Sequence, residues 1–171
     1  DEVSGLLAAA RLANTGGLDP EAFASCRRRI NDQLDVLTGL PRADRWMEIR
    51  PGAVARIIEL SRRVGDVVID SGFSLEDDTD LARASGRNQT TIDAIANADR
   101  IVLVGSAEPV GLSRLTRSLV SVNEATSLPV HVVVNRMRDS LGWRQRDIQD
   151  LILTYAEPAS IDFVPLDLNN V

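Results

Sequence analysis

The sequence predicts an α/β fold in which a mostly parallel sheet of about five strands is flanked by helices. Two observations carry this prediction. Short apolar segments rich in β-branched residues alternate along the chain with longer segments of helical spacing. The chain also has 171 residues, of which 44% are hydrophobic and 26% charged, which is ordinary for one compact domain. We therefore expect a single α/β domain over residues 1–171.

The helices are marked by caps, by prolines at their first turns and by apolar spacing. Ser4 is a capping residue for a first helix, and Asp19-Pro20-Glu21 opens a second one. The second helix is expected to carry Phe23 and Ile30 inward and the arginines at 27–29 outward. Later helices are expected from Pro51, over 90–97, from Pro109 and over 142–155.

The expected strands lie at 34–39, 66–70, 101–105, 130–134 and 161–164. The stretch Asp66–Gly72 is central, because its β-branched run predicts a strand buried on both faces that ends at a carboxylate. Ligands of open parallel sheets bind outside the carboxyl ends of such strands. Asp70 therefore stands where an aspartate can hold Mg²⁺. The alternative is a strand-end aspartate that caps the following turn.

Composition excludes several classes of function. The sequence has no lysine, so it cannot supply the lysine of a phosphate-binding P-loop or form a lysine Schiff base. The sequence has a single cysteine, Cys26, which excludes an internal disulfide. With only one histidine, His131, in addition, a zinc site within the chain is implausible. His131 is expected to be a packed side chain rather than a catalyst. No Gly-x-Gly-x-x-Gly motif follows a strand, which argues against the hypothesis of a dinucleotide-binding enzyme.

Charge and hydropathy limit which partners and which cellular location are expected for the chain. The net charge of −6 does not favour direct binding to nucleic acid. The arginines at 27–29 and at 62–63 are interpreted as solvated helix faces, with a partner or DNA contact as the alternative. The acidic run at 76–80 is interpreted as a solvated loop, with a contribution to binding a metal near Asp70 as the alternative. No apolar run has the length of a membrane span, and a cytoplasmic location is expected.

Four short motifs follow one another in a set order: Val67–Asp70, Ala98–Val104, Val132–Arg136 and Phe163–Asp167. They resemble, in turn, the Walker B strand, the Ala-Asp helix end before an apolar strand, the adenine-recognition strand end and the Pro-x-Asp loop of the MinD/ParA group of P-loop ATPases. The segment Leu34–Gly39 upstream is similar to that of the CpaE-like branch, with its septum-site and pilus-assembly relatives. The resemblance implies a P-loop NTPase-like three-layer sandwich.

The resemblance also implies a role for each matching residue. Asp70 would engage Mg²⁺ and its waters, and Gly72 would belong to the switch that senses the γ-phosphate. Asn135 would hydrogen-bond adenine, with Arg136 packed beside it. The base pocket would be lined by Pro165 and Asp167. The implied protein is an ATP-dependent switch that forms a homodimer and recruits a protein of septum, pilus or partition machinery.

The sequence departs from the family in two places. The switch Asp-x-Pro-x-Gly is here Asp70-Ser71-Gly72-Phe73, without the proline, and the glycine-rich loop with its lysines is absent. We expect the chain to be the carboxyl-terminal part of a larger protein, so that ATPase activity belongs only to an intact protein with a P-loop. Without the P-loop strand, the strands at Ile69 and Val102 are expected to pair directly, or the chain to self-associate. The alternative function is a pseudo-ATPase interaction module that binds no nucleotide.

Overall fold

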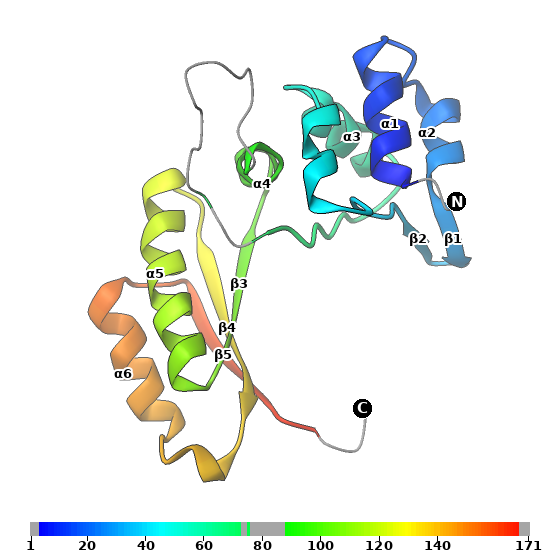
Figure 1. Ribbon diagram of the computed structural model, residues 1–171. Coiled ribbons are helices and arrows are strands. Elements are labelled where there is room, and N and C mark those ends of the chain that lie inside the picture. The colour runs from blue at the N-terminus through cyan, green and yellow to red at the C-terminus, as the bar shows by residue number, and fades with distance from the viewer. Residues whose placement is uncertain (1–3, 73–74, 76–87, 168–171) are drawn as a thin grey trace. The chain divides into compact units, whose positions relative to one another are not determined.

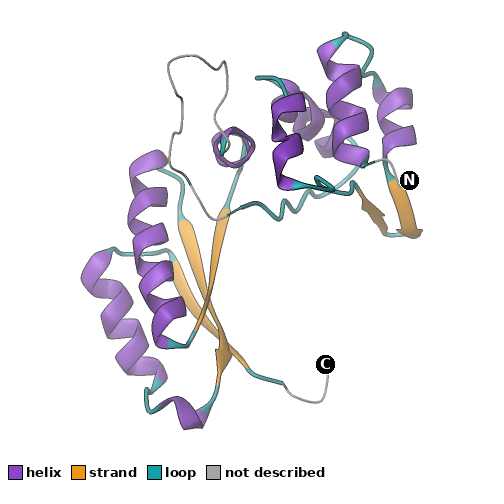
Figure 2. Cartoon of the chain, in the orientation of Figure 1, coloured by secondary structure: helices purple, strands orange, loops and turns teal. Residues whose placement is uncertain are grey.

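The computed structural model describes residues 4–72, 75 and 88–167, and the chain divides into two compact units (Figure 1). Unit 1 comprises residues 1–97 and unit 2 comprises residues 98–171. Unit 1 is mainly helical, whereas unit 2 is α/β (Figure 2). The acidic run at 76–80 lies outside the described residues, and the single domain over 1–171 stays a prediction. Among the helices described, none has the length and apolar character needed to cross a bilayer.

Unit 1 is built from helices that begin at the expected capping residues. Its elements are α1 (Gly5–Asn14), α2 (Pro20–Cys26), β1 (Arg28–Asn31), β2 (Leu34–Val36), the 3-10 helix η1 (Ala43–Glu48), α3 (Ala53–Arg62) and α4 (Gln89–Ala96). The Ser4 hydroxyl accepts the Leu7 N–H at 3.2 Å, and the Asp19 carboxylate accepts the Ala22 N–H at 2.8 Å. Each cap satisfies one of the amides that a helix start leaves without an intrahelical partner.

The core of unit 1 lies between α1, α2 and α3. The predicted apolar face of α3 is confirmed, since Val54, Ile57, Ile58 and Leu60 are all buried. Leu7 and Ile49 pack in one buried cluster with this helix, and Leu18 and Phe23 pack in another. Burial of an aliphatic side chain of this size is worth about 1.5–3 kcal/mol, so these contacts fix how the three helices pack.

The segment after Cys26 differs from the prediction of a continuing helix. Residues 28–31 form a strand that pairs antiparallel with β2, and Ile30 is 53% exposed rather than inward-facing. Asp35 explains part of the difference, because its carboxylate accepts hydrogen bonds from Arg27 at 2.7 Å and from Arg29 at 3.4 Å. The segment 34–39 therefore contributes a short hairpin strand and no strand of the parallel sheet.

The prediction of a buried strand at 66–70 is wrong. The segment has no regular secondary structure and belongs to no sheet within the described residues, and Val68 is 96% exposed. A strand requires a neighbouring backbone to pair with its N–H and C=O groups. No described strand supplies one here, so the expected direct pairing with the strand at Val102 is also not formed. Self-association stays a prediction.

Unit 2 contains a parallel sheet of three strands in the order β3–β4–β5, in place of the expected five. Its elements are β3 (Ile101–Ser106), α5 (Pro109–Ala125), β4 (Val130–Met137), the 3-10 helix η2 (Asp139–Leu141), α6 (Gln145–Tyr155) and β5 (Ser160–Pro165). Both long helices lie on the same side of the sheet (Figure 1). Each connection is a strand–helix–strand crossover, which confirms the parallel α/β character of this half of the chain.

The two faces of this sheet differ in burial. Val132 and Val134 of β4 are fully buried and pack in the layer that α5 and α6 cover, with Ile148 and Ile152 of α6 equally buried. Val102 and Val104 of β3 point to the other face and are 59% and 60% exposed. Unit 2 therefore has two layers within the described residues, and the third layer of the expected sandwich stays a prediction.

Candidate functional site

The candidate site is the edge of unit 2 where β3, β4 and β5 end. In parallel sheets this carboxyl edge is where ligands bind. Two backbone hydrogen bonds fix the turns there. The Ala107 N–H donates to the Asn135 carbonyl at 2.8 Å, and the Leu166 N–H donates to the Met137 carbonyl at 2.9 Å. The three chain segments that leave the sheet are thus held beside one another at their first residues.

A β-bulge lies in this edge, at Asn135 and Arg136. The register between β4 and β5 runs from Val134 opposite Phe163 to Met137 opposite Pro165, so β4 has one residue more than β5 over this span. Arg136 adopts φ 61°, in the left-handed region, and no other described residue except glycine has a positive φ. Bulges with a left-handed residue re-aim the neighbouring side chains and occur often beside active sites.

The bulge exposes the carboxamide of Asn135, whose expected role in recognising a base stays a prediction. Asn135 is exposed, and its Oδ1 accepts the N–H of Arg136 at 2.7 Å. This contact fixes the orientation of the amide group, while the second lone pair of Oδ1 and the two N–H donors remain as further bonding capacity. A carboxamide held in this way matches the donor and acceptor pair on the edge of adenine.

The amino end of α5 packs against the end of β3 at the same edge. A Cβ placed on Gly111 would lie 2.0 Å from Ser106 Oγ and 2.6 Å from the Ser106 carbonyl oxygen, so the helix start and the strand end approach as closely as glycine allows. Arg138, which follows β4, donates to the Glu108 carboxylate at 3.3 Å. This ion pair joins the turn before α5 to the segment after the bulge.

The structure brings three of the six expected site residues together. Pro165 lies opposite Met137 at the end of β5, next to the bulge that contains Asn135 and Arg136. Asp167 is exposed two residues beyond Pro165. These positions agree with a shared edge, but their roles in binding a base stay predictions.

Asp70 and Gly72 belong to unit 1. Asp70 is exposed at the end of the segment 66–70, which has no regular secondary structure. Gly72 approaches α4, and a Cβ at this position would lie 3.4 Å from Thr91 Oγ1. Within residues 4–72, 75 and 88–167, no group of three or more His, Cys, Asp or Glu side chains is placed to hold a metal. The Mg²⁺ role of Asp70 therefore stays a prediction.

His131 lies on the sheet face that α5 and α6 leave open. Its Nδ1 is 3.0 Å from Ser160 Oγ, and that hydroxyl donates to the Asp162 carboxylate at 3.0 Å. A carboxylate can only accept, so both contacts are satisfied together when the hydroxyl donates to Asp162 and Nδ1 carries a hydrogen. The imidazole is thus tied into a side-chain network across β4 and β5.

The resemblance to the MinD/ParA group singles out Asn135 and Arg136 at the end of an apolar strand, but it indicates neither the bulge nor the role of Gly111. The signal for Gly111 was present, since a glycine two residues after Pro109 interrupts a helical first turn. No local signal marked the bulge, because arginine gives no indication of a left-handed backbone. Comparison with protein-family models, with curated proteins and with solved structures finds no match.

Proposed function

We propose that this chain is part of an ATP-dependent switch protein of the MinD/ParA/CpaE type, which positions septum, chromosome or pilus machinery. The observation that supports this proposal most is the bulge at Asn135 and Arg136, which presents a fixed carboxamide at the carboxyl edge of a parallel sheet. A backbone outlier at such an edge is a reason to infer a ligand site.

In this proposal each site residue has one task. Asn135 binds the adenine edge, Arg136 packs beside the base, and Pro165 and Asp167 border it. Asp70 offers the hard oxygen donor that Mg²⁺ prefers. The lysine that contacts the phosphates must come from outside this sequence, which contains none. ATP turnover therefore belongs to an intact protein with a P-loop, in which nucleotide state controls homodimer formation and partner recruitment.

Calorimetric titration of the intact gene product with Mg-ATP tests the proposal. Asn135→Ala removes both hydrogen bonds to the base and is expected to weaken ATP binding by about tenfold or more. Asn123→Ala removes the same side chain from an exposed position on α5 and is expected to leave binding unchanged. Equal affinities in the two variants would remove Asn135 from the site, and no ATP binding by the intact protein would overturn the proposal.

A second candidate function is a pseudo-ATPase scaffold that binds proteins and no nucleotide. It is favoured by the open face of β3, where Val102 and Val104 both keep more than half of their surface in water. Contiguous exposed apolar side chains are typical of surfaces that bind other proteins. The same titration separates the two candidates, because a scaffold shows no heat of Mg-ATP binding in either the intact protein or this chain.

A further inference from the structure

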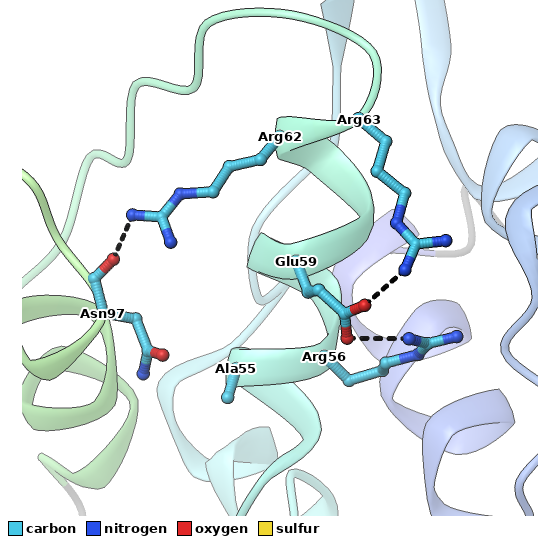
Figure 3. Close-up of a pocket in the computed structure, with 6 residues that line it drawn as sticks. All are labelled: Ala55, Arg56, Glu59, Arg62, Arg63 and Asn97. Atoms are coloured by element: carbon cyan, nitrogen blue, oxygen red, sulfur yellow. Dashed lines mark hydrogen bonds and ion pairs between the residues drawn. The ribbon is translucent and has the colours of Figure 1, made fainter.

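Unit 1 contains a groove between α3 and the end of α4. The groove has a volume of ≈ 610 Å³. Its lining comes from one face of α3 and from the residue that follows α4, and consists of Ala55, Arg56, Glu59, Arg62, Arg63 and Asn97 (Figure 3). The volume exceeds that of a single small anion and suits a short stretch of polypeptide.

The charge of the groove is opposite to that of the chain. Three guanidinium groups and one carboxylate line it, so positive charge is in excess, whereas the whole chain carries a net charge of −6. A concave surface with one sign of charge raises the local concentration of ligands of the opposite sign. The groove is therefore matched to an anionic ligand.

Two of the guanidinium groups are held in place by one carboxylate. Glu59 Oε2 accepts from Arg56 Nη1 at 2.7 Å, and Glu59 Oε1 accepts from Arg63 Nη2 at 2.5 Å. These hydrogen bonds, with that of Arg56 the stronger influence, lower the pKa of Glu59, so the carboxylate stays ionised. Arg56 is anchored a second time, since its Nη2 donates to the Leu18 carbonyl at 3.3 Å.

The third guanidinium extends to the other side of the groove. Arg62 Nη2 donates to the Asn97 carbonyl at 2.6 Å, at the carboxyl end of α4. Figure 3 shows Arg62 directed toward Asn97, while Arg56 and Arg63 converge on Glu59 and the short side chain of Ala55 lies between the two groups. The groove thus has a cation on each side of a small-residue floor.

We propose that this groove binds an acidic segment of a partner protein, with carboxylate side chains contacting Arg62 on one side and Arg63 on the other. A guanidinium carries five N–H donors in a fork that fits a carboxylate, so it can bind an incoming carboxylate beside the contacts it already makes. Because internal hydrogen bonds already orient the three arginines, binding costs less side-chain entropy. The inference depends on unit 1 alone and not on nucleotide binding.

A protein segment fits the groove better than a nucleic acid. Glu59 lies within the positive surface and would repel a continuous chain of phosphates. The acidic chain as a whole also repels a long polyanion, whose affinity depends on many phosphate contacts. An acidic peptide can place a neutral residue opposite Glu59 and Ala55, and carboxylates opposite the arginines.

Fluorescence anisotropy with a labelled peptide of alternating glutamate and glycine tests this proposal. Arg62→Gln/Arg63→Gln is expected to weaken peptide binding by about tenfold or more, since it removes two charged hydrogen-bond donors. The matched control is Arg114→Gln/Arg117→Gln, which removes the same charge from exposed positions on α5 and is expected to leave binding unchanged. Circular dichroism of each variant verifies that its helices are retained.

Glu59→Gln is a second variant with the opposite expected sign. It removes one negative charge from the groove, while the amide oxygen of glutamine can still accept a hydrogen bond from an arginine, so the peptide is expected to bind about threefold tighter or more. Equal weakening by the groove pair and by the α5 pair would show a non-specific charge effect and overturn the proposal. Weaker peptide binding after Glu59→Gln would also overturn the proposal. Tighter binding of duplex DNA than of the acidic peptide at equal ionic strength would overturn it as well.

Discussion

Arg136 adopts a backbone conformation that costs a non-glycine residue about 1–2 kcal/mol. The hydrogen bonds on both sides of it maintain this conformation, since the carbonyls of Asn135 and Met137 accept amide hydrogens from the neighbouring chain segments. The side chains of Asn135 and Arg136 are consequently presented in fixed directions at the sheet edge. At the scale of single residues, this is the feature on which the proposal of a ligand site at the sheet edge depends.

Glu48 controls a pH-dependent contact in unit 1. A hydrogen bond from Arg45, and then those from Arg11, lower the pKa of Glu48 from its ordinary value of 4.5 to about 2. Because the folded-state pKa is the lower one, the stabilisation is complete above pH 4.5 and is lost as the pH falls toward 2. We expect Glu48→Gln to lower the melting temperature at neutral pH and to reduce its fall below pH 4.5, as measured by circular dichroism at a series of pH values.

The control for this prediction is Glu124→Gln, at an exposed position of α5. It is expected to leave both the neutral melting temperature and its acid dependence as in the unsubstituted chain. The interpretation of Glu48 is contradicted if the two variants follow the same pH profile.

At the scale of elements, α5 is placed on β3 by close contacts that only glycine permits. Gly111→Ala is expected to lower the free energy of unfolding. Alanine gains about 1 kcal/mol of helix propensity over glycine, but overpacking costs about 1–3 kcal/mol and here includes a backbone carbonyl at 2.6 Å. Urea denaturation measures the net change. The control is Gly65→Ala, whose new methyl group meets nothing within 4 Å, so its free energy of unfolding is expected to stay unchanged. If Gly111→Ala is as stable as Gly65→Ala, the close contact between Gly111 and Ser106 is refuted.

The helices were predictable because their signals are local. Ser4, Asp19 and Pro109 each mark a helix start within a few residues, and the apolar spacing of α3 identifies its buried face. Strands depend on partners that are distant in sequence. The run at 66–70 has the composition of a strand but no described neighbour, and the strand at 28–31 has no strand composition but pairs with β2.

The candidate site was predictable to a similar extent. The positions of Asn135 and Pro165 at the ends of parallel strands followed from the order of the elements. The bulge depends on how β4 and β5 align, which sequence does not show. In the sequence, only the pair Arg62 and Arg63 indicates the groove. Arg56 and Glu59 become recognisable once α3 is known, because Glu59 lies three residues after Arg56 and four before Arg63 and pairs with both.

At the scale of the whole molecule, each unit has its own core, and the segment at 66–70 lies in unit 1 but contributes no buried side chain to its core. We expect Val68→Asp to change the free energy of unfolding by about 0.5 kcal/mol or less, because the side chain is 96% exposed. Val132→Asp, at a fully buried position of β4, is expected to cost about 3 kcal/mol or more. Urea denaturation of both variants measures the difference. A large loss in Val68→Asp would show that the segment is buried after all, as in a self-associated form.

The open face of the unit 2 sheet has a consequence for how stability varies with temperature. Val102 and Val104 already contact water in the folded chain, so unfolding transfers less apolar surface into water than burial on both faces would. The heat capacity of unfolding increases with newly exposed apolar surface. Unit 2 should therefore have a heat-capacity increment below the usual value of about 12–15 cal/mol/K per residue, and a flatter dependence of its stability on temperature.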